Sequence, residues 1–206
     1  MNMNEKVTLY TIQPIEWYQK LLKQGIIYGK PDKNKVAELE FTYAYNWISK
    51  QMAKRIGKPP LKDLLPIWSW FQYDNIQRRK PDLRNSAHLE KGTKGIRIEF
   101  KKNRKDILLS DFQLWHLPLM YCGIKDSESE DLEFDEKLKS FNIDWRDKEN
   151  YPIELKQEIE KSWEKIFDMD YCPEYTAVPF EKKSIQATFW SLSINEIVHV
   201  DEFIAR

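Results

Sequence analysis

The sequence is poor in the residues on which several common classes of protein depend. Its 206 residues include only two Cys, three His and six Gly. Two cysteines argue against a secreted disulfide scaffold, which normally carries more of them in a regular pattern. The His and Cys residues are too scattered for a structural zinc site, so no metal site is expected. The few glycines form neither a Walker-type phosphate loop nor a dinucleotide-binding fingerprint.

Net charge and long apolar runs are also missing. The 33 basic and 33 acidic side chains cancel, so no overall field attracts nucleic acid, and a nucleic-acid partner is disfavoured. No apolar stretch approaches the roughly 18 residues that a membrane-spanning helix needs. The first residues show no hydrophobic signal core. We therefore expect a cytoplasmic protein without a membrane partner.

Aromatic residues, by contrast, are abundant. They make up 14% of the chain and include eight Trp, while charged residues make up 32%, a composition typical of a folded domain. The pattern predicts an α+β fold in which a mixed, mainly antiparallel sheet packs with several helices. We expect a single domain over residues 1–206, with a helical insertion at 124–170. Expected strands are 7–12, 66–73, 96–100, 107–109, 185–192 and 194–203, and expected helices are 15–24, 36–56 and 152–167.

Residues 107–119 form the best-defined stretch. Ile107, Leu108 and Leu109 predict a short buried strand, and the apolar residues that follow have helical spacing. Ser110 precedes Gln113 by three residues, the spacing of a helix-capping box. The polar turn before this stretch predicts that strands 96–100 and 107–109 form a hairpin.

Three polar side chains are candidates for catalysis: Asp111, His116 and Gln186. Asp111 and His116 lie on the expected helix, and Gln186 begins the last strong strand. Asp111 and His116 also have structural interpretations. Asp111 suits helix capping, and a histidine on such a helix is often a satisfied interior residue.

Candidate ligand-binding residues lie in the middle of the chain. The polar stretch 74–95, with little periodicity, predicts a functional loop that contains Asp82 and Arg84. Trp68 and Trp70 lie on one face of the preceding strand, where aromatic rings can stack on a nucleobase or nicotinamide. Arg84 or Arg97 would then hold phosphate. The alternatives are a surface ion pair or turn for Asp82 and Arg84, and core packing for the tryptophans.

Four motifs suggest a family. These motifs, Leu9-Tyr-Thr-Ile-Gln-Pro, Pro81-Asp-Leu-Arg84, Leu109-Ser-Asp-Phe-Gln-Leu-Trp-His116 and Ile185-Gln-Ala-Thr-Phe-Trp190, together resemble domain of unknown function 3841 (DUF3841), an uncharacterised bacterial family. The resemblance spans essentially the whole chain. It implies a small, cytosolic, stand-alone bacterial protein and no particular activity.

A shorter resemblance links residues 7–25 to the opening strand and helix of ADP-ribosyltransferase-type folds. In those folds the first strand carries a His or Arg that holds NAD, and this position corresponds to Thr11. The resemblance implies that Trp68 or Trp70 faces the nicotinamide and that Gln186 replaces the usual Glu. Thr11 and Gln186 depart from the usual residues, so it implies a changed or lost activity.

Two functions therefore remain open, ahead of a third in which Lys50, Lys54, Arg55 and residues 78–80 bind RNA or DNA, which the neutral overall charge disfavours. The first is a nucleotide-binding protein, with NAD as its candidate ligand, in which Arg84, Asp111, His116 and Gln186 converge on an aromatic-walled pocket. The second is a non-catalytic module that binds a protein partner through exposed aromatic residues and the long loop. Neither cofactor nor enzymatic activity follows from the sequence alone.

Overall fold

The sheet of this protein places the strand that carries Trp68 and Trp70 between the strand of Thr11 and the strand of Gln186. The structure is a computed structural model, and it describes residues 5–29 and 41–206. The chain divides into a first unit, Met1–Leu109 with Ser184–Arg206, and a second unit, 110–183. The expected insertion, 124–170, lies within the second unit. The start of the expected helix 36–56, residues 36–40, lies outside the described residues.

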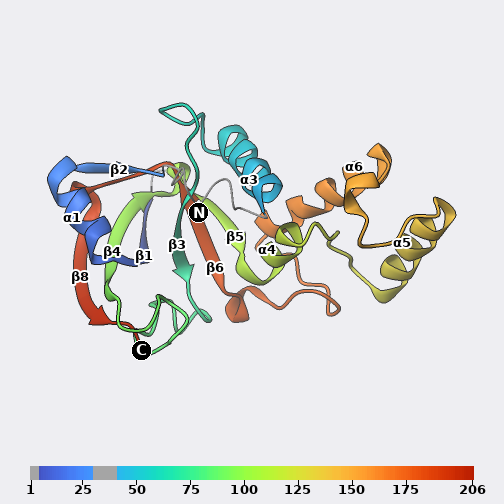
Figure 1. Cartoon of the computed structure of the whole chain (residues 1–206). Helices are drawn as coiled ribbons and strands as arrows, with labels where there is room; N and C mark the ends of the chain where they lie inside the picture. Colours follow the sequence, from blue (N-terminus) through green and yellow to red (C-terminus); the bar gives the residue numbers. More distant parts are fainter. Residues whose placement is uncertain (1–4, 30–40) are drawn as a thin grey trace. The chain divides into compact units, whose positions relative to one another are not determined.

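The six-stranded sheet has the order β5-β6-β3-β1-β4-β8. Each pairing for which a register is defined in this sheet, β1 with β3 and β4, β3 with β6, and β4 with β8, is antiparallel. Figure 1 shows β4, β1, β3 and β6 running side by side. The α+β class with a mainly antiparallel sheet is therefore confirmed. The strands are β1 Lys6–Pro14, β3 Ile67–Gln72, β4 Lys94–Asn103, β5 Leu108–Asp111, β6 Ile185–Phe189 and β8 Ile197–Ile204.

Alternation along β4 creates the core side of the sheet. Ile96, Ile98 and Phe100 are fully buried, whereas Arg97 and Glu99 between them remain partly exposed. Successive side chains of a strand point to opposite faces, so an apolar–polar alternation separates a core face from a polar face. The polar face carries the ion pairs described below. The expectation for 96–100 is thus confirmed.

The helices of the first unit follow local sequence signals. Pro14 directly precedes α1 (Ile15–Gln24), where its fixed φ suits a helix start. Gly25 ends α1 with a φ of 73°, a conformation that glycine adopts without steric cost. Helix α3 (Thr42–Arg55) contributes Trp47, Ile48 and Met52 to the core. Strands β2 (Ile26–Tyr28) and β7 (Ser191–Ser193) form a second, two-stranded sheet.

Two local expectations are wrong. Strands β4 and β5 do not form a hairpin, because β4 pairs with β1 and β8 while β5 lies beside β6 at the far edge. The helix cap is displaced by one residue, because β5 continues through Asp111. Asp111 therefore caps α4 (Phe112–Leu119) by accepting hydrogen bonds from the backbone N–H groups of Gln113 and Leu114. The Ser110 hydroxyl is buried without a hydrogen-bond partner among the described residues.

The second unit is helical. It contains α4, α5 (Glu128–Ser140) and α6 (Ile153–Ser162), and α6 continues into a 3-10 helix, Trp163–Phe167. Trp163 is fully buried and donates a hydrogen bond from Nε1 to the carbonyl oxygen of Cys122, at 2.7 Å. This bond ties the segment after α4 to the 3-10 helix, and it satisfies the indole N–H in the core.

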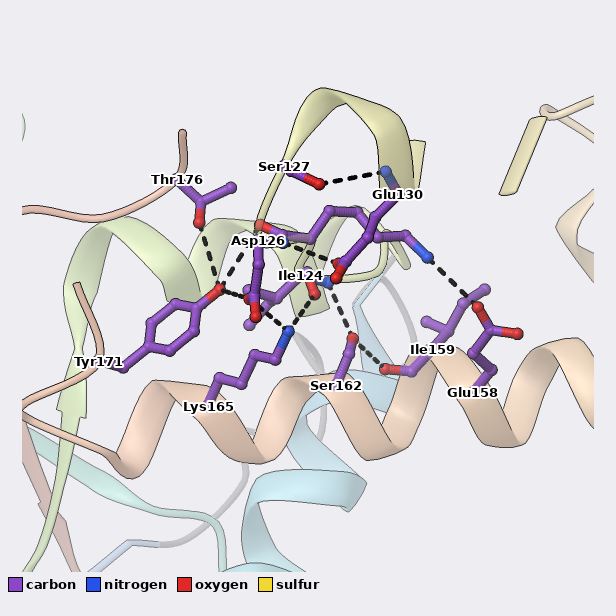
Figure 2. A network of polar contacts seen from close by, with 11 residues as sticks. Ile124, Asp126, Ser127, Glu130, Glu158, Ile159, Ser162, Lys165, Tyr171 and Thr176 are labelled. Carbon is purple, nitrogen blue, oxygen red and sulfur yellow. Dashed lines mark hydrogen bonds and ion pairs between the residues drawn. The ribbon is translucent and has the colours of Figure 1, made fainter. Parts of the chain in front are cut away.

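A polar network holds the segment between α4 and α5 against the α6 region (Figure 2). Lys165 donates to Asp126 Oδ1 at 2.7 Å and to the carbonyl of Ile124 at 3.0 Å. The Tyr171 hydroxyl donates to the same carboxylate at 2.5 Å, and the backbone N–H of Ile124 donates to Ser162 Oγ at 2.8 Å. Burial and the hydrogen bond to Asp126 raise the pKa of Tyr171. The residues on both sides of Lys125 are thereby fixed in place.

No helix in residues 5–29 and 41–206 is long and apolar enough to cross a membrane. The same residues contain no group of three or more His, Cys, Asp or Glu side chains arranged to hold a metal ion.

Candidate functional site

A small pocket on the sheet of the first unit brings together four of the residues singled out from the sequence. Its volume is about 230 Å³, and we call it the ring pocket. It combines aromatic rings with short polar side chains, the composition of a site for a planar polar ligand. It is lined by Thr11, Ile12, Gln13, Trp68, Ser69, Trp70, Ala87, His88 and Gln186.

Strand register explains why Trp68, Trp70 and Gln186 lie together. Trp70 on β3 lies opposite Tyr10 on β1 and opposite Gln186 on β6. Directly paired residues share one face of a sheet, so Trp70 and Gln186 point to the same side, and Trp68 joins them two residues earlier. Thr11 follows Tyr10 in β1, so its side chain points to the opposite, buried face, where its hydroxyl donates to the carbonyl of Trp68 at 3.1 Å.

The polar groups of the ring pocket differ in how many hydrogen-bond partners they have. Gln13 Nε2 donates to Thr11 Oγ1 at 3.0 Å, so the threonine hydroxyl already has two partners. The Gln186 side-chain oxygen is buried and has no hydrogen-bond partner among the described residues. A buried acceptor without a donor destabilises the protein, and a ligand N–H or O–H would relieve that cost.

The two tryptophan rings are held by neighbouring tyrosines. Tyr45 of α3 contacts Trp68 edge-on at 6.3 Å, and Tyr73 contacts Trp70 edge-on at 5.0 Å. Tyr73 in turn contacts the ring of His88 at 5.6 Å. Edge-to-face pairs of this kind orient aromatic rings, so these contacts fix the orientation of the Trp68 and Trp70 rings.

A second hollow adjoins this aromatic row and carries most of the local positive charge. It has a volume of about 520 Å³, and we call it the basic pocket. Tyr73 lines it and also contacts Trp70 and His88 of the ring pocket, so the two hollows are neighbours. The remaining lining residues are Asp74, Gln77, Arg78, Arg79, Lys80, Asp82 and Arg84.

The cations of the basic pocket are partly neutralised. Arg78 pairs with Asp74 at 3.3 Å, and Arg84 donates both side-chain and backbone hydrogen bonds to Asp82. These bonds hold the pKa of Asp82 well below its usual range. Arg79 lies over the Phe71 ring at 4.3 Å. The lining carries four cations and two carboxylates, and Lys80 also pairs with Asp201 and Glu99 outside the lining.

Arg97 lines neither pocket but anchors the loop that forms the basic one. It donates two hydrogen bonds to Asp201 Oδ2, at 2.6 and 3.0 Å, and one to the carbonyl of Pro81 at 2.5 Å. Lys80 also pairs with Asp201, at 3.4 Å. Arg97 therefore holds the loop between Lys80 and Asp82, and the carboxylate of Asp201 compensates its charge.

The Asp201 cluster predicts a specific loss of stability in acid. Burial raises the pKa of Asp201, but hydrogen bonds from Arg97 and His199 and the charges of Arg97 and Lys80 lower it from 3.8 to about 2. A lowered carboxylate pKa stabilises the fold fully above the unfolded-state value, and this contribution is lost as pH falls from about 4 to about 2. Because Asp201 is 29% exposed, we expect a contribution of roughly 1 kcal/mol after allowance for solvent screening.

This prediction is checked by chemical denaturation of the unmodified protein and the Asp201→Asn variant between pH 2 and pH 7. The unmodified protein should lose roughly 1 kcal/mol more of its unfolding free energy than the variant over the lower part of this range. Equal losses in the two proteins would contradict the assignment.

The remaining catalytic candidates, Asp111 and His116, belong to the second unit. Asp111 is 2% exposed, and besides capping α4 it accepts a hydrogen bond from Lys183 Nζ at 2.7 Å. His116 is exposed, and its Nδ1 contacts the carbonyl oxygens of Phe112 and Gln113 in its own helix. The prediction that His116 is a buried interior histidine is therefore wrong. Both side chains make contacts that stabilise α4.

The sequence therefore located part of the site. Thr11, Trp68, Trp70 and Gln186 share the ring pocket, while Asp82 and Arg84 line the basic pocket. The sequence analysis did not single out His88, Gln13 or Ser69 of the ring pocket, although His88 lies in the loop identified as functional. It assigned the basic run Arg78-Arg79-Lys80 of that loop to a disfavoured nucleic-acid surface, whereas the structure places all three residues in the basic pocket.

Comparison with known proteins adds a family but no relative of established function. No curated protein and no solved structure matches the chain. The family model described as Domain of unknown function (DUF3841) matches residues 8–198, which include both pockets. The chain therefore belongs to the DUF3841 family.

Proposed function

We propose that the first unit binds a nucleotide of the NAD type, with its planar ring in the ring pocket and its phosphates in the basic pocket. The observation that carries this proposal is the adjacency of an aromatic, amide-bearing hollow and a hollow lined by four cations. A nucleotide combines the two corresponding groups, a flat polar ring and a phosphate chain. The ADP-ribosyltransferase-like arrangement expected for Thr11, Trp68, Trp70 and Gln186 supports the same ligand.

The size of the ring pocket supports a single ring. At about 230 Å³, it is smaller than the roughly 300–1,000 Å³ of pockets that enclose a whole drug-sized ligand. Nicotinamide presents an aromatic ring to Trp68 or Trp70 and a carboxamide N–H to the Gln186 oxygen, which otherwise has no described partner. The rest of a dinucleotide must then lie outside this pocket.

The basic pocket supports the phosphate assignment. Arginine guanidinium groups present several N–H donors in a planar fork that matches phosphate oxygens. Arg78 and Arg84 are mostly exposed, with 77% of each side chain accessible, so a phosphate can reach them. Their carboxylate partners, Asp74 and Asp82, can return to solvent at small cost because exposed ion pairs contribute little.

The chemistry of Gln186 favours binding with changed or lost turnover. Cleavage of a glycosidic bond develops positive charge on the sugar, and a carboxylate stabilises that charge. An amide can accept a hydrogen bond from the ligand, but it carries no negative charge. The ring pocket has no carboxylate among its lining residues, so the proposed role is nucleotide recognition.

The proposal is tested by calorimetric titration with NAD, ADP-ribose and nicotinamide. Gln186→Leu should weaken NAD and nicotinamide by about threefold to tenfold, as expected for a lost neutral hydrogen bond, and should leave ADP-ribose unchanged. Arg84→Ala should weaken NAD and ADP-ribose but not nicotinamide.

Arg55→Gln is the matched control, because Arg55 is an exposed arginine on α3 that lines neither pocket. It should bind all three ligands like the unmodified protein. If none of the ligands binds the unmodified protein, nucleotide recognition is wrong, and the alternative of a protein-binding module takes its place.

A further inference from the structure

The second unit contains a pocket of its own, separate from the residues of the ring and basic pockets. Its volume is about 420 Å³, within the range typical of small-molecule sites. Every residue that lines it belongs to residues 121–159, so it is complete within this unit. We call it the helical pocket.

The walls of the helical pocket are mainly aromatic. Tyr121, Phe134, Trp145 and Tyr151 contribute rings, and Leu138 and Ile159 add aliphatic surface. The Tyr151 hydroxyl is satisfied by the carbonyl of Trp145 at 2.8 Å, so this ring offers the pocket mainly its apolar body. Such walls favour a flat apolar ligand.

Two lysines line the pocket, and they differ in their partners. Lys125 pairs with Glu158 at 3.4 Å and lies over the Phe134 ring at 4.2 Å. The network in Figure 2 fixes the residues on both sides of Lys125, which holds it in this place. Its charge is therefore compensated within the protein.

Lys148 has no such counter-ion in the described part of the chain. Its ammonium donates to the carbonyl of Met120, lies 3.8 Å from Cys122 Sγ and faces the Trp145 ring at 5.9 Å. Among the described residues, no carboxylate oxygen lies within 4.0 Å of it. A half-buried ammonium attracts a negatively charged group more strongly than one in open solvent does.

The acidic side chains limit which anion fits. Asp131 and Asp135 also line the pocket, and Asp131 already accepts a hydrogen bond from the Tyr175 hydroxyl at 2.5 Å. Two carboxylates in the lining oppose a ligand with several negative charges, such as a phosphate ester. A single carboxylate attached to a flat ring satisfies both the walls and Lys148.

We propose that the helical pocket is a binding site for a small aromatic carboxylate, whose ring packs among Phe134, Trp145 and Tyr151 and whose carboxylate pairs with Lys148. Cys122 lies beside the proposed carboxylate position, 3.8 Å from Lys148 Nζ, so its alkylation reports on occupancy.

Three matched probes test the proposal by calorimetry: 2-naphthoate, the neutral 2-naphthamide and the cationic 2-naphthylmethylammonium. We expect 2-naphthoate to bind most tightly. Lys148→Met should weaken 2-naphthoate by about tenfold to a hundredfold, as expected for the loss of a charge-assisted hydrogen bond, while 2-naphthamide binding stays within about threefold.

The controls separate charge from ring contacts. Lys156→Met is the matched lysine variant, because Lys156 also donates to a backbone carbonyl, that of Glu149, but does not line the pocket. It should leave all affinities unchanged. Lys148→Arg should retain 2-naphthoate binding, and Trp145→Leu should weaken the naphthoate and the amide alike. Trp145 is 56% exposed, so its replacement should preserve the fold.

Location is tested by alkylation with iodoacetamide, which transfers its carbamoylmethyl group to the cysteine sulfur and releases iodide. Saturating 2-naphthoate should slow the reaction of Cys122 and leave that of the exposed Cys172 unchanged. Four results would each overturn the proposal. The affinities for naphthoate and amide could be equal, the amine could bind most tightly, none of the probes could bind, or the alkylation of Cys122 could be unaltered.

Discussion

Replacement of Lys183 by methionine should destabilise the second unit by about 3–5 kcal/mol, as found when one partner of a buried ion pair is removed. Lys183 is fully buried, and its ammonium donates to Asp111 Oδ2 at 2.7 Å and to the carbonyl of Tyr171 at 2.9 Å. The variant leaves the carboxylate of Asp111 buried without its cation. The measurement is the free energy of unfolding from chemical denaturation, with the helical circular dichroism signal as the probe of unfolding.

A double variant separates charge from packing. Asp111→Asn retains the side-chain oxygen that caps Gln113 and Leu114, and its combination with Lys183→Met removes both charges. We expect this double variant to be more stable than Lys183→Met alone, because no uncompensated charge remains. Lys182→Met, at the exposed neighbouring position, should change stability by less than about 0.5 kcal/mol. A small effect of Lys183→Met would contradict the role assigned to the pair.

Gly29→Ala should destabilise the first unit by about 3 kcal/mol or more, at the upper end of overpacking effects. A Cβ atom at this position would lie 1.9 Å from the carbonyl oxygen of Leu65. The backbone cannot move away easily, because Gly29 accepts a hydrogen bond from the N–H of Leu65 at 2.6 Å and donates one to the carbonyl of Trp190 at 3.2 Å. The close approach of these three segments therefore requires glycine.

Gly123→Ala is the control for Gly29→Ala. There the nearest atom to an added Cβ is Lys125 Cε, at 3.3 Å, which belongs to a flexible side chain rather than to the backbone. We expect a change below about 1 kcal/mol. Thermal unfolding of both variants gives the comparison, and similar melting temperatures would show that the contact at Gly29 can relax.

The elements of this protein follow from local sequence signals. Pro14 and Gly25 mark the two ends of α1 because each restricts or permits a particular backbone conformation. The alternation of Ile96, Arg97, Ile98 and Glu99 predicts a half-buried strand, and it forms one. Such signals act over a few residues, so they are readable without knowledge of the rest of the chain.

The order of the strands is not a local property. The polar turn after Asn103 suggested a hairpin, yet β4 and β5 are separated by three other strands of the sheet. Antiparallel pairing depends on which apolar faces meet across the core, and many pairings satisfy one alternation pattern. The displacement of the helix cap from Ser110 to Asp111 has a related cause, since β5 extends to the residue that meets Lys183.

The candidate site divides in the same way. Sequence patterns alone show that Trp68 and Trp70 share one strand face, that Gln186 lies near the start of a strand and that a long irregular loop follows the strand of the tryptophans. Tertiary contacts place Gln186 opposite Trp70, bring His88 to the same pocket and face Lys148 toward an aromatic pocket without a carboxylate partner among the described residues. Periodicity sets the direction of a side chain within its own element, whereas its neighbours depend on contacts between segments far apart in the chain.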